Sequence, residues 1–157
     1  MTARVLYHAS RQPVRQPAIR PGLVARDFGP GFYCTEIKAQ AQRWAARFTH
    51  PGTISVFLLA DGRTRGLRKR VFPRMTNAWL DFIVACRRGI PHGYDLVEGP
   101  MADDSIFNFV QEFADGAISR QAFWALTQFR YPATQLSFHT PAALDALTYL
   151  THEHLQP

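Results

Sequence analysis

Residues 27–35 read Asp27-Phe28-Gly29-Pro30-Gly31-Phe32-Tyr33-Cys34-Thr35. Two glycines around a proline force a tight turn, and an aromatic pair follows directly. Because side chains alternate along a strand, Phe32 and Tyr33 face opposite sides, so at most one of them lines a cleft. We expect Phe32 to be buried beside the site and Tyr33 to present its ring to a ligand. The alternative is that both rings only pack in the core.

The chain on either side of this turn predicts strands and helices in irregular order. Strands are expected over 4–7, 53–59, 94–97 and 135–139, and helices over about 36–48 and from 76 or 77, 103 or 104, 119 and 140 onward. Residues 11–27 are rich in proline and predict a long loop, which in a compact domain is more often functional than idle. No glycine-rich dinucleotide fingerprint follows a strand, which argues against a doubly wound fold. The sequence predicts one α+β domain over residues 1–157.

The composition of the chain limits its partners. Its net charge is +6, and 16 of its 18 basic residues are arginine, a composition that suits phosphate recognition. The alternative explanation for the excess of arginine over lysine is a GC-rich coding sequence, whose codons favour arginine. The densest cluster is expected in a loop, as a solvated patch or as an attractor for a polyanion or an acidic partner: Arg63, Arg65, Arg68, Lys69, Arg70 and Arg74. Two cysteines without paired spacing predict neither a disulfide nor a metal site. With no apolar segment of membrane-spanning length and no signal-peptide pattern, we expect a cytoplasmic protein without a membrane partner.

Several motifs in order carry a resemblance to a known family. They are Leu6-Tyr7-His8-Ala9-Ser10, the turn 27–35, Trp79-Leu80-Asp81-Phe82, Arg87-Arg88-Gly89, the stretch 94–104 and Thr134-Gln135-Leu136-Ser137-Phe138-His139-Thr140. Together they resemble a bacterial family of unknown function related to the ADP-ribosyltransferases, over residues 5–150. The resemblance implies a split, twisted antiparallel β core of the ADP-ribosyltransferase type, with NAD as substrate in a cleft between its halves. It also implies a toxin-like mono-ADP-ribosyltransferase acting on a protein or nucleic acid, with a small antitoxin-like partner.

The same resemblance implies roles for three residues. In the diphtheria-toxin-like branch, three strand positions carry His, Tyr and Glu, and His8, Tyr33 and Gln135 match them. His8 would bond a ribose hydroxyl, the small Ala9 and Ser10 would let the backbone approach the nicotinamide, and Tyr33 would stack on its ring. The alternatives are a structural histidine and plain core packing.

Gln135 departs from the family's glutamate. An amide can orient the ribose but cannot act as a general base at neutral pH. Three explanations stay open: the acceptor needs no deprotonation, as with a nucleobase ring nitrogen; the base comes from elsewhere; or catalysis is lost and NAD or ADP-ribose binding remains. Gln135 as an ordinary strand-edge residue is the plain alternative. A basic nucleic-acid-binding domain is a further alternative function, although no RNA or DNA motif is recognisable.

Other candidate residues come from the loops. Asp104, with Asp103 beside it, follows an expected Gly99-Pro100 turn and is the leading spare carboxylate, although helix capping explains both. Asp27 is a weaker candidate of the same kind. Arg20 and Arg26 could hold the NAD diphosphate or be solvated loop charges.

Overall fold

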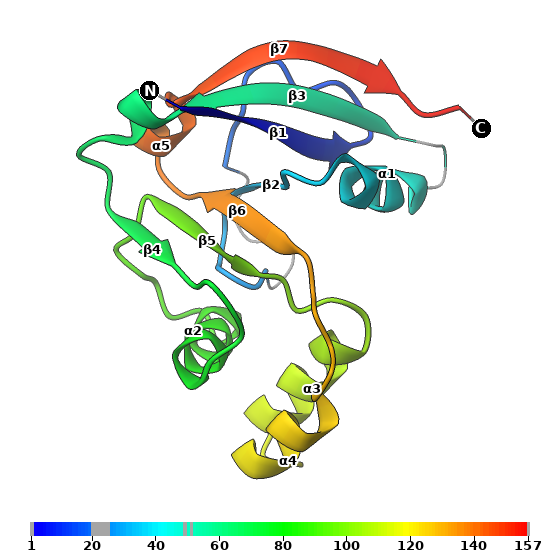
Figure 1. Cartoon of the computed structure of the whole chain (residues 1–157), viewed down its shortest axis with the longest axis vertical. Helices are drawn as coiled ribbons and strands as arrows, with labels where there is room; N and C mark the ends of the chain where they lie inside the picture. Colours follow the sequence, from blue (N-terminus) through cyan, green and yellow to red (C-terminus); the bar gives the residue numbers. More distant parts are fainter. Residues whose placement is uncertain (1, 20–25, 49, 51, 157) are drawn as a thin grey trace.

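Two β-sheets form the frame of the protein (Figure 1). A computed structural model describes residues 2–19, 26–48, 50 and 52–156, without the side chain of Asp104. The first sheet is antiparallel in the order β1-β3-β7, from strands Ala3–Ser10, Thr53–Ala60 and Leu147–His154. The second has the order β2-β6-β5-β4, from strands Phe32–Cys34, Thr134–Phe138, Leu96–Pro100 and Lys69–Val71. Its β4–β5 pair is parallel and its other pairs are antiparallel.

The two sheets meet at one backbone contact in the described chain. Tyr7 of β1 and Thr35, the residue after β2, form an isolated bridge with N–H···O distances of 2.8 and 2.9 Å. Beyond this bridge, the sheets are joined by a cluster of apolar side chains that includes Leu6 of β1 and Leu136 of β6. The bridge therefore fixes where β1 and β2 come together.

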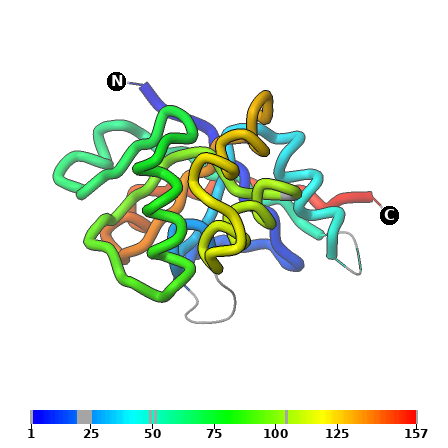
Figure 2. The backbone as a smooth tube through the Cα atoms, turned by 90° about the horizontal axis from the view of Figure 1, so that it is seen from below, coloured from blue at the N-terminus to red at the C-terminus, as the bar shows by residue number. Residues whose placement is uncertain are grey.

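The helices lie on the outer faces of the sheets. Helix α1 (Lys38–Ala46) packs on β1 and β3, whereas α2 (Asn77–Arg87), α3 (Asp104–Ala114) and α4 (Arg120–Leu126) lie below the second sheet, nearest the viewer in Figure 2. Two short turns, η1 (Asp61–Thr64) and α5 (Pro141–Leu144), precede β4 and β7. The cap residues Thr76, Ser119 and Thr140 accept backbone N–H groups of their own first turns, as the sequence predicts.

The buried apolar side chains form separate clusters on the two sides of β2. Phe32 belongs to the cluster between the sheets, with Leu6, Phe57 and Phe138, whereas Tyr33 belongs to the cluster under the helices with Trp79. The expected opposite orientation of Phe32 and Tyr33 is confirmed, and so is the α+β fold class. No helix in the described part of the chain has the length and hydropathy needed to cross a membrane.

Four local expectations were wrong. Residues 69–71 form an edge strand instead of a loop, because they pair with β5. The helix expected from residue 140 onward covers only Pro141–Leu144, and residues 147–154 form β7 because they pair with β3. Gly99 and Pro100 continue β5 instead of turning. Helix α1 starts at Lys38 instead of about residue 36, and its N-cap residue Ile37, which makes no side-chain cap bond, donates its own N–H to Thr35 Oγ1.

Candidate functional site

His8 lies in β1, one residue after the bridge between the sheets. Its Nδ1 is 2.6 Å from the carbonyl oxygen of Tyr33, so Nδ1 carries the proton and donates. In the neutral ring this tautomer makes Nε2 an acceptor. The ring stacks on Phe32, with 4.0 Å between centroids and 21° between planes. Both contacts fix the orientation of the imidazole.

Tyr33 is held at both ends of its side chain. Its hydroxyl donates to Gly29 O at 2.5 Å and accepts from Phe28 N at 3.1 Å, so the preceding turn closes onto the strand. Burial raises the pKa of the Tyr33 phenol, which therefore stays protonated. The guanidinium of Arg26 lies 5.3 Å from the ring centroid.

Gln135 is the second residue of β6 and is tied to Asp27. Its Nε2 donates to Asp27 Oδ2 at 3.1 Å. Because Nε2 points at the carboxylate, Oε1 points away from it and can accept a hydrogen bond. No group in the described part of the chain donates to Oε1.

Asp27 is the centre of a buried polar cluster. It accepts the backbone N–H of Ala102 at 2.6 Å and pairs with Arg87 Nη2 at 3.2 Å. Burial raises the pKa of the Asp27 carboxyl, while the bonds from Ala102, Arg87 and Gln135 act in the opposite direction. Arg87 also donates to Phe107 O and covers the Phe107 ring, which connects the cluster to α3.

The structure brings the three motif segments together but not onto one open surface. His8 contacts the backbone of Tyr33, and the turn residues Asp27 and Phe28 join Gln135 to Tyr33. The His8 ring lies on the Phe32 side of β2, whereas the Tyr33 ring is on the other side. Tyr33 and Gln135 are only 7% and 6% exposed. Binding of one ligand across all three residues stays a prediction.

The remaining predicted residues have different positions. Ala9 packs beside α1, and Ser10 donates to Gln12 O at 2.6 Å. Asp103 is the N-cap residue of α3, but its side chain makes no capping hydrogen bond. Asp104 is the first residue of the helix, and its side chain is not among those that the structure describes. Arg20 lies outside the described residues. The structure thus connects Asp27 to Gln135, although the sequence ranked Asp104 higher.

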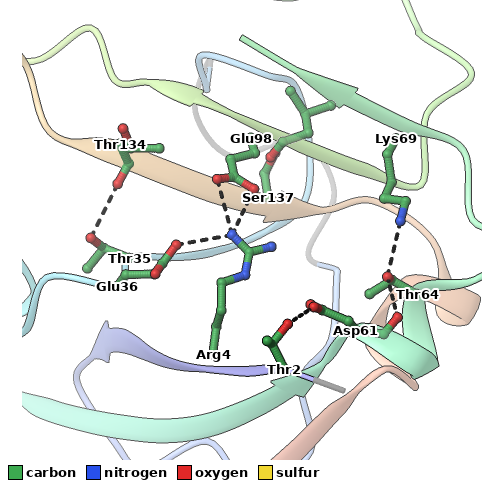
Figure 3. A network of polar contacts seen from close by, with 11 residues as sticks. Thr2, Arg4, Thr35, Glu36, Asp61, Thr64, Lys69, Glu98, Thr134 and Ser137 are labelled. Carbon is green, nitrogen blue, oxygen red and sulfur yellow. Dashed lines mark hydrogen bonds and ion pairs between the residues drawn. The ribbon is translucent and has the colours of Figure 1, made fainter. Parts of the chain in front are cut away.

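A cavity of about 450 Å³ lies apart from these residues. It opens between β1 and the β4–β5 side of the second sheet, with this lining: Arg4, Asp61, Thr64, Lys69, Val71, Leu96 and Glu98. Arg4 Nη1 reaches both Glu98 Oε1, at 2.9 Å, and Glu36 Oε1, at 3.1 Å (Figure 3). Lys69 Nζ donates to Thr64 Oγ1 at 3.1 Å.

Arg87 was missed as a site residue by the sequence reasoning. It belongs to the Arg87-Arg88-Gly89 motif, but the sequence does not show which arginine turns inward. The structure answers this, because the Arg87 side chain is 4% exposed and pairs with a residue 60 positions away.

Comparison with protein families finds a match over most of the chain. Residues 4–149 match the model of a family described as Protein of unknown function (DUF3990). A search of curated proteins found no match.

Proposed function

The chain belongs to this family of unknown function, and on that premise we propose that it is a mono-ADP-ribosyltransferase that uses NAD. The observation that best supports the proposal is the bond from His8 Nδ1 to Tyr33 O at the joint between the sheets. There the first two segments of the His-Tyr-Gln pattern come into direct contact, and the turn residues Asp27 and Phe28 join Gln135 to Tyr33.

The reaction breaks the bond between ribose C1′ and the nicotinamide nitrogen. Nicotinamide leaves with the bonding electrons, C1′ acquires oxocarbenium character, and the acceptor's nucleophilic atom bonds to C1′ and loses its proton. In this proposal His8 Nε2 accepts a hydrogen bond from a ribose hydroxyl. Tyr33 lies on the other side of β2 and is 7% exposed, so stacking on the nicotinamide requires its ring to become exposed when NAD binds. The backbone at Ala9 and Ser10 holds the carboxamide, and the cations Arg20 and Arg26 approach the diphosphate.

Gln135 would act through its Oε1. Asp27 fixes the amide by accepting a hydrogen bond from Nε2–H, so Oε1 is oriented to accept a hydrogen bond from a ribose hydroxyl. We assign Asp27 as a positioning residue for Gln135, because its carboxylate is already bound by three donors. This arrangement favours an acceptor that is nucleophilic without a general base, such as a nucleobase ring nitrogen. Asp104 is the alternative carboxylate if a base is needed.

A second candidate function is an inactive module that binds NAD or ADP-ribose. The amide at position 135 favours it, because an amide stabilises positive charge at C1′ less than a carboxylate does. One assay distinguishes the candidates: the protein is incubated with NAD labelled in its adenylate part and with a bacterial lysate. Label on protein or nucleic acid supports the transferase and identifies the acceptor class. NAD binding by calorimetry without transfer or hydrolysis supports the inactive module, and absence of both contradicts the NAD site.

Paired histidine variants test the role of His8. His8→Ala is expected to lower transfer of label by about a hundredfold, within the range for one positioned catalytic group. His154→Ala is the control, because it changes a histidine in β7 of the same sheet whose side chain hydrogen-bonds to Thr53 Oγ1 and contacts the ring of His152, away from Tyr33. Circular dichroism monitors folding of both variants. Equal activity of the two folded variants would remove His8 from the proposed site.

The toxin-like role and the small neutralising partner belong to the same proposal. Expression in a bacterial host tests them: the active protein should slow growth, and His8→Ala should not.

A further inference from the structure

Strand β4 leaves one side of its sheet unpaired. It is the outer strand of the order β2-β6-β5-β4, and Figure 1 shows β5 on its inner side. The backbone groups of Arg68 and Phe72 face β5, since Leu96 N donates to Arg68 O and Phe72 N donates to Glu98 O. By the alternation of a strand, the N–H and C=O groups of Lys69 and Val71 face outward. No backbone partner contacts them within the described residues.

The segment around this edge is strongly basic. It contains six cations and, from Gly62 to Leu80, no acidic residue: Arg63, Arg65, Arg68, Lys69, Arg70 and Arg74. All except the half-buried Arg70 are exposed. None of the six forms a salt bridge with a described carboxylate, although 12 acidic residues occur in the chain. The cluster therefore retains its positive potential.

The edge also adjoins the cavity between the sheets. Lys69 and Val71 point to the same face of β4 and line that cavity, while Arg70 and Phe72 point to the other face. Val71 is 54% exposed although it is a strand residue with an apolar side chain. A segment added beside β4 would place every second side chain over this face, where Lys69 offers a cation and Asp61 and Glu98 offer carboxylates, the latter paired with Arg4.

We propose that the β4 edge and the adjoining cavity bind an acidic, extended segment of a partner protein as an added strand. The outward backbone groups of Lys69 and Val71 would hold its main chain, the cavity would take the uncharged side chains that alternate with its acidic ones, and the basic cluster would attract its carboxylates. A lysine on an edge strand also discourages pairing with strands of other chains that carry no opposite charge. An acidic segment is therefore the partner that this edge favours. The open backbone and exposed Val71 favour a peptide over a nucleic acid, whose phosphates need neither.

The test uses a fluorescein-labelled short peptide in which glutamate and threonine alternate. Amide hydrogen exchange followed by NMR should slow at Lys69 and Val71 when the peptide binds. A peptide of the same sequence with N-methyl groups on alternate residues keeps its charge but cannot pair as a strand, and its binding should be at least about tenfold weaker.

The only two lysines of the chain give a matched pair of variants. Lys69→Glu should weaken peptide binding by about tenfold, whereas Lys38→Glu, on exposed α1, should change it by no more than about twofold. Unchanged exchange at Lys69 and Val71, or equal binding of the N-methylated peptide, would overturn the proposal. Displacement of the peptide by a single-stranded oligonucleotide, with tighter binding of the latter, would also overturn it and indicate a nucleic-acid surface.

Discussion

Replacing Asp27 with alanine tests the buried ion pair that holds Gln135. The side chains of Arg87 and Asp27 are 4% and 12% exposed, so removing the carboxylate leaves a guanidinium buried without its counterion. Such a change typically costs about 3–5 kcal/mol. The control is Asp81→Ala, because the Asp81–Arg120 pair is 59% and 41% exposed and should contribute about 1 kcal/mol or less. We therefore expect the two variants to differ by at least about 2 kcal/mol in the free energy of unfolding.

Urea unfolding followed by tryptophan fluorescence measures this difference, because Trp79 is fully buried near α3. Asp27→Asn should fall between the two variants, since its amide can still accept from Ala102 or Gln135 but lacks the charge for Arg87. In the folded fraction, Asp27→Asn should also lower the turnover attributed to Gln135. A difference of less than about 1 kcal/mol between Asp27→Ala and Asp81→Ala would refute the reasoning, since breaking the pair would then cost no more than at the surface.

Three other changes have defined outcomes. Burial lowers the pKa of His139 from 6.5 to about 4, so between these pH values the unfolded chain takes up a proton that the folded chain does not. The free energy of unfolding should therefore fall by about 3 kcal/mol as the pH drops through this window. Urea unfolding of His139→Gln should show a flatter pH dependence, and an unchanged slope would assign the pH dependence to other groups. A Cβ at Gly31 would lie 2.8 Å from His139 Nδ1, so Gly31→Ala should lower stability by about 1–3 kcal/mol in thermal unfolding, whereas Gly93→Ala, with its nearest contact at 3.7 Å, should be close to neutral; equal effects would contradict the close packing. Gln135→Ala should lose most NAD turnover, Gln135→Glu should bind NAD and keep or raise its hydrolysis, and the wild-type rate from about pH 6 to 8 should show no ionisation from this position; wild-type turnover in Gln135→Ala would direct attention to Asp104.

Local sequence rules predicted much of the fold, and the exceptions in its strands share one cause. The apolar run of β3 and the caps at Thr76, Ser119 and Thr140 are local signals, and the structure confirms each. Strand β4 contains Lys69 and Arg70, which are typical of a solvated loop. Its extended form depends on pairing with β5, and a pairing partner that distant is not visible in a local pattern.

In the candidate site, too, local patterns were predicted from the sequence and contacts between distant segments were not. Alternation predicted the opposite faces of Phe32 and Tyr33, because that rule needs only neighbouring residues. The contact of Asp27 with Arg87 and Gln135 joins three distant segments, so the sequence shows only an acidic residue before a turn.

The central position of β3 has a consequence for how the protein folds. β3 pairs with β1 on one edge and with β7 on the other, and the second register joins Thr53 to His154. Contacts between residues so far apart in sequence form slowly, because a long loop must close before any hydrogen bond is gained. Until β7 docks, the apolar strand β3 presents an unpaired edge on which another chain can assemble. We therefore expect aggregation during refolding to compete with the docking of β7, and yield to fall steeply with protein concentration.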